Sequence, residues 1–207
     1  MLKKFTIFLY FSSILLIAQN NTQEIELEVG WSIFSTYIIP ESNGLEDVFS
    51  DVIDDVVIIK DEDGNAFWPE FNLNSIGSIQ LGSAYLIKMK NANNLSISGT
   101  VGECNNIINL DTGWSLIGYL DNVSSNVENQ FYNIPELTIL KDDEGNIYWP
   151  IFSINTIQEL QPGKGYQIKL NNPIEFNYNC NNECVEYNYS CNGGTWQTEV
   201  YWEIQDN

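Results

Sequence analysis

The chain has 207 residues, of which 28 are acidic and eight are lysines, and it contains neither arginine nor histidine. A net charge of −20 excludes a protein that holds nucleic acid by its phosphates and disfavours anionic membrane surfaces, because both need a basic surface. The missing histidine removes His-ligated metal sites and the Ser-His and Cys-His nucleophile pairs, which leaves paired carboxylates as the obvious catalytic option.

Residues 1–18 have the pattern of a secretory signal peptide. Lys3 and Lys4 precede an apolar run from Phe5 to Ala18. This run is about 14 residues long, which is too short to span a bilayer comfortably. We therefore predict cleavage near Ala18, a secreted or cell-surface protein, and no membrane insertion after cleavage. An uncleaved N-terminal anchor is the alternative.

The rest of the chain contains a long duplication. Residues 60–89 align without a gap with residues 141–170, at an offset of 141 − 60 = 81 positions. Upstream, the Gly-Trp-Ser of 30–32 matches that of 113–115. Internal similarity of this length predicts repeated structural units.

We predict an α+β, β-rich fold with two homologous small domains in tandem. Their expected boundaries are 24–103 and 104–179, and each should have about four or five strands and one short helix. Residues 180–207 contain alternating Glu-Val-Tyr-Trp-Glu-Ile, which predicts a strand. We interpret this segment as the incomplete start of a further β domain, or as a tail that pairs with the repeat.

Each copy opens with a strand and continues into a short helix. The second copy alternates around Ile-Asn-Leu-Asp-Thr-Gly-Trp-Ser-Leu-Ile-Gly, which predicts a strand interrupted at Gly113. Ser125 and Glu128 fit a capping box, as do Asn43 and Glu46 in the first copy. The apolar positions that follow at helical spacing are Leu45, Phe49 and Val52 in the first copy, and Val127, Phe131 and Ile134 in the second.

The phrases Lys-Asp-Glu-Asp-Gly-Asn at 60–65 and Lys-Asp-Asp-Glu-Gly-Asn at 141–146 come next, between strand-like runs. Asp61, Asp63, Asp142 and Glu144 are candidate calcium ligands. However, glycine stands at position 4 when counted from Asp61 or Asp142, whereas an EF-hand loop has it at position 6. Acidic residues before Gly-Asn are typical of a tight hairpin. A hairpin is therefore our prediction, with a weak calcium site or a catalytic carboxylate pair as alternatives and no other cofactor.

An aromatic return strand follows each phrase and ends at a proline, and a turn and two more strands complete the copy. Trp68, Phe71, Trp149 and Phe152 are candidates for a ligand groove, since exposed aromatic rings can stack on sugars. Buried packing is the main interpretation of the repeated aromatic residues, above all of Trp31 and Trp114.

The chain has four cysteines, Cys104, Cys180, Cys184 and Cys191. An exported protein meets an oxidising compartment, so disulfides are expected. Three pairings are possible, and the sequence does not choose among them.

The second copy, with GWSLIGYL, ILKDDEGNIYWP and INTIQELQPGKGYQIKL, resembles a tandem module of large secreted and cell-surface proteins of Gram-negative bacteria. The resemblance covers roughly residues 26–178. It implies an ancillary role beside other domains of a longer chain, and it transfers no catalytic residues. The first copy departs from the pattern, because 81–84 reads Leu-Gly-Ser-Ala where the second copy has Pro-Gly-Lys-Gly.

These observations predict a non-enzymatic, secreted or surface-displayed tandem module that acts as a binding or adhesion unit. The expected partner is an extracellular glycan or a surface protein. One alternative is a structural spacer that positions another domain of a longer exported protein. A carboxylate-based hydrolase is the third hypothesis.

Overall fold

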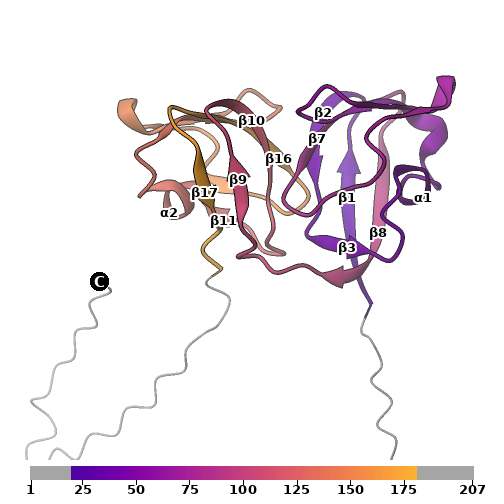
Figure 1. Cartoon of the computed structure of the whole chain (residues 1–207), viewed down its shortest axis with the longest axis horizontal. Helices are drawn as coiled ribbons and strands as arrows, with labels where there is room; N and C mark the ends of the chain where they lie inside the picture. The colour runs from indigo at the N-terminus through magenta and orange to yellow at the C-terminus, as the bar shows by residue number, and fades with distance from the viewer. Residues whose placement is uncertain (1–19, 181–207) are drawn as a thin grey trace, which may run out of the picture.

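A computed structural model describes residues 20–180 (Figure 1). The predicted signal peptide at 1–18 lies outside the described residues, as does the tail from 181 onward with Cys184 and Cys191. Among the helices of residues 20–180, none has the length and apolar composition needed to cross a membrane.

The first half has one α-helix and eight strands in two antiparallel sheets. Its elements are β1 (Asn21–Leu27), β2 (Gly30–Ser35), β3 (Ile38–Pro40), α1 (Leu45–Val48), η1 (Ile53–Asp55), β4 (Val56–Lys60), β5 (Ala66–Trp68), η2 (Pro69–Phe71), β6 (Leu73–Asn74), β7 (Ala84–Met89) and β8 (Asn93–Val101). One sheet has the order β2-β7-β4-β5-β6, and the other has the order β1-β8-β3.

The second half has a similar five-stranded sheet, but it has two two-stranded sheets where the first half has one sheet of three strands. Its elements are β9 (Ile108–Leu110), β10 (Gly113–Gly118), β11 (Ser125–Asn126), α2 (Val127–Phe131), β12 (Leu137–Lys141), β13 (Ile147–Trp149), η3 (Pro150–Phe152), β14 (Ile154–Asn155), β15 (Glu159–Leu160), β16 (Gly165–Leu170) and β17 (Ile174–Phe176). The large sheet has the order β10-β16-β12-β13-β14, and β17-β9 and β11-β15 form two-stranded sheets.

The β-rich α+β class is confirmed, but four or five strands per copy was too low. The described part of the chain has eight strands in the first half and nine in the second. Several have only two or three residues, such as β6 and β14. A segment this short has no readable alternation, so only pairing in three dimensions identifies it as a strand.

Each half has its own hydrophobic core. In the first, Phe34 packs against Phe49 and Tyr85, with ring centroids 5.5 Å apart in both pairs. In the second, Phe131 stacks on Phe176 at 5.0 Å. The predicted apolar faces of the two short helices lie in these cores. Burial of a side chain of this size stabilises a fold by about 1.5–3 kcal/mol.

The predicted capping boxes are wrong in their details. Asn126, and not Ser125, caps α2, and its side chain accepts hydrogen bonds from the backbone N–H of Glu128 and Asn129 at 2.8 and 3.3 Å. The Glu128 carboxylate instead accepts from Asn155 Nδ2 at 3.0 Å. Gly44 holds the same position at α1, without a side-chain cap. Asn126 satisfies two free N–H groups alone, so no reciprocal glutamate is needed.

One residue beside each helix has a left-handed backbone conformation, and this suggests a stabilising substitution. Gly77 (φ 80°) and Gln158 (φ 64°) each present a carbonyl to the first helical N–H, at 3.2 and 3.0 Å. A side chain in this region costs about 1–2 kcal/mol. Gln158→Gly should therefore raise the free energy of unfolding by about 0.5–1 kcal/mol, after the chain-entropy cost of glycine. Urea denaturation measures this, and Gly77→Gln is the matched control, expected to destabilise. An unchanged midpoint in both variants would contradict the prediction.

Candidate functional site

The two acidic phrases form hairpins, as predicted. Strand β4 pairs with β5, and β12 pairs with β13. In the first hairpin, Asp61 accepts hydrogen bonds from the backbone and side-chain nitrogens of Asn65, both at 2.8 Å. Asp142 and Asn146 repeat this geometry at 2.7 Å. The first acid of each phrase therefore closes its own turn.

The second acid of each phrase reaches the other half of the molecule. Asp143 Oδ2 accepts a hydrogen bond from the backbone N–H of Ile33 in β2 at 2.8 Å. Reciprocally, Glu62 Oε2 accepts from the backbone N–H of Leu116 in β10 at 3.1 Å. Each hairpin is thus hydrogen-bonded to a strand of the large sheet in the other half. The sequence alone did not indicate this role, because a partner 54 or 110 positions away leaves no local pattern.

Backbone hydrogen bonds continue the same reciprocal arrangement. The N–H of Ser35 donates to the carbonyl of Gly163, and the N–H of Gly118 donates to the carbonyl of Gly82, both at 2.9 Å. Strands β2 and β10 are the edges of the two large sheets, so each half covers the free edge of the other. Equivalent surfaces meet, as at a two-fold interface.

Two buried tyrosines position the turns that supply these carbonyls. The hydroxyls of Tyr85 and Tyr166 accept hydrogen bonds from the backbone N–H of Gln80 and Gln161, both at 2.9 Å. Burial raises the pKa of both phenols, and a tyrosine hydroxyl is protonated at neutral pH even without such a shift. The different residues at 81–84 and 162–165 do not change the turn, because Gly82 and Gly163 have φ of 87° and 86°.

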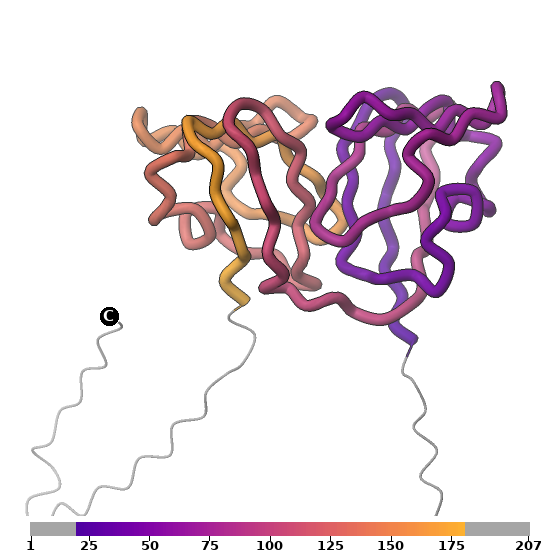
Figure 2. Tube along the Cα trace, viewed as in Figure 1, coloured from indigo at the N-terminus to yellow at the C-terminus, as the bar shows by residue number. Residues whose placement is uncertain are grey.

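A small apolar seam fills the contact between the halves. Ile33, Ala84 and Leu116 form a buried cluster of their own. Gly165 occupies the position equivalent to Ala84 and lies directly against it, with no room for a side chain. The figures show the halves side by side, joined along the lower edge by the pink connection after β8 (Figure 2).

The remaining candidate calcium ligands lie apart from one another. Asp63 is exposed, and Glu144 pairs with Lys164 at 3.5 Å. Within residues 20–180, no three carboxylate, cysteine or histidine side chains are grouped so that they could hold a metal ion. Calcium binding at the turns stays a prediction.

The candidate ligand-binding aromatics form two separate pairs. Trp68 and Phe71 pack edge to face at 4.7 Å, and Trp149 and Phe152 do so at 4.6 Å. Each tryptophan is partly buried, whereas Phe71 and Phe152 are 64% and 61% exposed. The segments η2 and η3 lie at opposite ends of the long axis (Figures 1 and 2). The four residues therefore line two surfaces and not one groove.

The second half has two further exposed apolar side chains, Tyr132 and Ile151, and Ile151 directly precedes Phe152 in the chain. Both line a groove of about 490 Å³, together with Pro135 and Pro150. Ser50 and Glu70 occupy the corresponding positions of the first half. The two ends therefore differ in polarity.

The prediction that Trp31 and Trp114 lie in the core is wrong. They are 50% and 51% exposed. Phe34 points into the core, so alternation along β2 places Trp31 on the opposite face with Ile33. This alternation was readable in the sequence, but which face of the sheet is buried was not.

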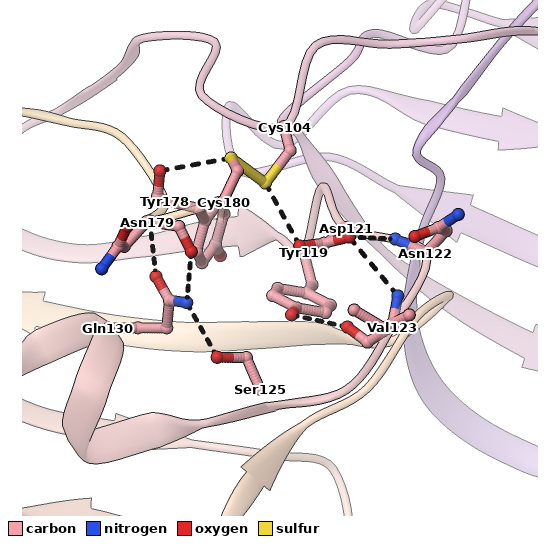
Figure 3. Close-up of a disulfide and its surroundings, with 10 residues drawn as sticks. All are labelled: Cys104, Tyr119, Asp121, Asn122, Val123, Ser125, Gln130, Tyr178, Asn179 and Cys180. Atoms are coloured by element: carbon pink, nitrogen blue, oxygen red, sulfur yellow. Dashed lines mark hydrogen bonds between the residues drawn. A yellow bond between two sulfur atoms is a disulfide. The ribbon is translucent and has the colours of Figure 1, made fainter. Parts of the chain in front are cut away.

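One disulfide lies in the described residues, between Cys104 and Cys180, with Cα atoms 6.0 Å apart (Figure 3). It joins the start of the second half to the segment after β17. Nearby, Gln130 Nε2 donates to the carbonyl of Asn179 at 3.0 Å, and the N–H of Asn179 donates to Gln130 Oε1 at 2.7 Å. Together these links hold the end of the second half against α2.

Comparisons with models of protein families, with curated proteins and with solved structures found no match to this chain.

Proposed function

We propose that this chain is a secreted or surface-displayed, non-enzymatic pair of homologous modules that binds an extracellular ligand, with glycan as the ligand class. The expected setting is a longer exported protein. The observation that carries the proposal is the exposed aromatic pair at each end. An exposed phenylalanine supported edge-on by a tryptophan offers a rigid apolar surface, and ordering such a surface on a ligand costs little conformational entropy.

The positions of the two ends of the described chain also favour a binding unit over the spacer alternative. Both ends of the described part of the chain lie on the same, lower side of the coloured fold (Figure 1). In a spacer, the two ends of the module lie far apart, so that the module separates the domains joined to it. In this fold the two ends lie on one side, which leaves the opposite side free to face a ligand. The carboxylates of the acidic phrases support a non-enzymatic role, because Asp61, Glu62, Asp142 and Asp143 are engaged in structural hydrogen bonds.

Phe152→Ala tests this function. The wild-type protein should bind at least one neutral polysaccharide on a glycan array, and Phe152→Ala should weaken that binding about tenfold or more, a loss of about 1.4 kcal/mol. Phe71→Ala should have a smaller effect, because the first half has Ser50 and Glu70 where the second half has the apolar Tyr132 and Ile151. Since both side chains are exposed, circular dichroism should show an unchanged fold.

Ile107→Ala is the matched control, since Ile107 is equally exposed outside the pairs. It should leave the affinity unchanged. If the wild-type protein binds no glycan or matrix polymer, or if the control weakens binding as much as Phe152→Ala, the spacer hypothesis replaces this one.

A further inference from the structure

Each half carries an exposed tryptophan flanked by two lysines, here named a Lys-Trp-Lys cluster. The first cluster consists of Trp31, Lys60 and Lys88, and the second of Trp114, Lys141 and Lys169. The ammonium nitrogens lie 5.7 and 5.9 Å from the ring centroid in the first cluster, and 4.9 and 5.8 Å in the second. Strand register sets this geometry, since Trp31 lies directly opposite Lys88 and Trp114 lies opposite Lys169.

These clusters hold most of the positive charge of the folded part. Apart from the two lysines of the predicted signal peptide, the chain has six, and four of them are in the clusters. The other two are engaged elsewhere, because Lys164 pairs with Glu144 and Lys90 donates to the carbonyl of Asp54. Within residues 20–180, none of the four cluster lysines makes an ion pair, although the chain has 28 acidic residues.

The chemistry of each cluster matches a ring that carries a negative charge. Two ammonium groups held close to one indole repel each other, and a carboxylate between them would interact favourably with both. The half-exposed indole offers a flat apolar surface on which the C–H face of a sugar ring can stack. We propose that each Lys-Trp-Lys cluster binds one uronic-acid residue of an acidic polysaccharide.

This inference rests on the proposed function, because it names a ligand class for the same module pair, but it uses residues distinct from the aromatic pairs. Two clusters on one chain give a long polymer two points of attachment, and a polymer that engages both gains affinity over one that engages a single cluster.

Outside the clusters the protein is strongly acidic, so the binding of a polyanion should depend on ionic strength. Its repulsion of a polyanion reaches about 30 Å at 0.01 M ionic strength but only about 8 Å at 0.15 M, whereas direct lysine-carboxylate contacts persist at short range. The binding measurement therefore belongs at physiological salt. A chelator should be present, so that calcium cannot bridge two sets of carboxylates.

The test compares retention on immobilised polygalacturonate with retention on the same polymer after full methyl esterification, in 0.15 M NaCl with EDTA. The wild-type protein should bind the carboxylated polymer and not its ester. Lys141→Gln with Lys169→Gln should weaken binding about tenfold or more, because it removes one of two linked sites. Lys90→Gln with Lys164→Gln removes the same charge outside the clusters and should change affinity by less than about twofold.

Three results would overturn the inference: no binding of the wild-type protein to polygalacturonate, equal binding to the ester, or equal losses in the two lysine variants. Binding of neutral glycan distinguishes this failure from failure of the proposed function. That binding depends on Phe152 and should survive in the Lys141/Lys169 variant.

Discussion

Gly165→Val should lower the free energy of unfolding by about 3 kcal/mol, because a side chain at this position has no space between the two halves. A Cβ on residue 165 would lie 2.5 Å from Ala84 Cβ and 2.6 Å from Ile33 Cγ2. The halves must then move apart, which breaks the backbone hydrogen bonds that Ser35 and Gly118 donate across the interface.

Denaturation followed by two probes measures the effect. The wild-type protein should unfold in one transition, because each half covers the sheet edge of the other, and the variant should show a lower midpoint or two transitions. Hydrogen exchange of the Ser35 and Gly118 amides should accelerate in the variant. Adding Ala84→Gly should recover part of the loss, since it removes one of the two clashing groups. A single transition at the wild-type midpoint would contradict the packing described above.

Replacing both Cys104 and Cys180 by alanine should cost the second half up to about 4 kcal/mol. The bond closes a loop of 76 positions, so its loss gives the unfolded chain much more freedom. The bond itself lies wholly in the second half, but because the two halves should unfold together, its loss should lower the midpoint that both halves share.

Thermal unfolding of the double variant measures this loss, with probes in each half. Cys184→Ala with Cys191→Ala is the control for losing two cysteines, and a mass map of the wild-type disulfides checks the pairing. An unchanged midpoint in the Cys104/Cys180 variant would show that the bond does not contribute to stability. A different pairing in the mass map would refute the Cys104–Cys180 disulfide.

Several features of the fold were predictable because they depend on neighbours in sequence. The hairpins at 60–65 and 141–146 follow from Gly-Asn after acidic residues, and Pro69 and Pro150 end their strands as expected. The buried helix positions, such as Phe49 and Phe131, follow from their spacing.

The candidate site was less predictable. Sequence reasoning selected Trp68 and Trp149 with their phenylalanines, but it did not show that the pairs lie at opposite ends. It placed Trp31 in the core, although the structure leaves this ring half exposed beside two lysines. Residue type predicts burial only on average, and the buried face of a sheet depends on what packs against it.

The acidic phrases at 60–65 and 141–146 show which features depend on the sequence alone and which depend on the tertiary structure. By itself the sequence determined the duplication, the hairpin turn and the acidic surface, since composition and local turn chemistry suffice for these. Only the tertiary structure decided that Glu62 and Asp143 hold the other half, that Cys104 pairs with Cys180, and that Lys60 and Lys141 lie over tryptophans. Each of these contacts joins residues brought together by folding, and the packing of whole sheets sets their distances.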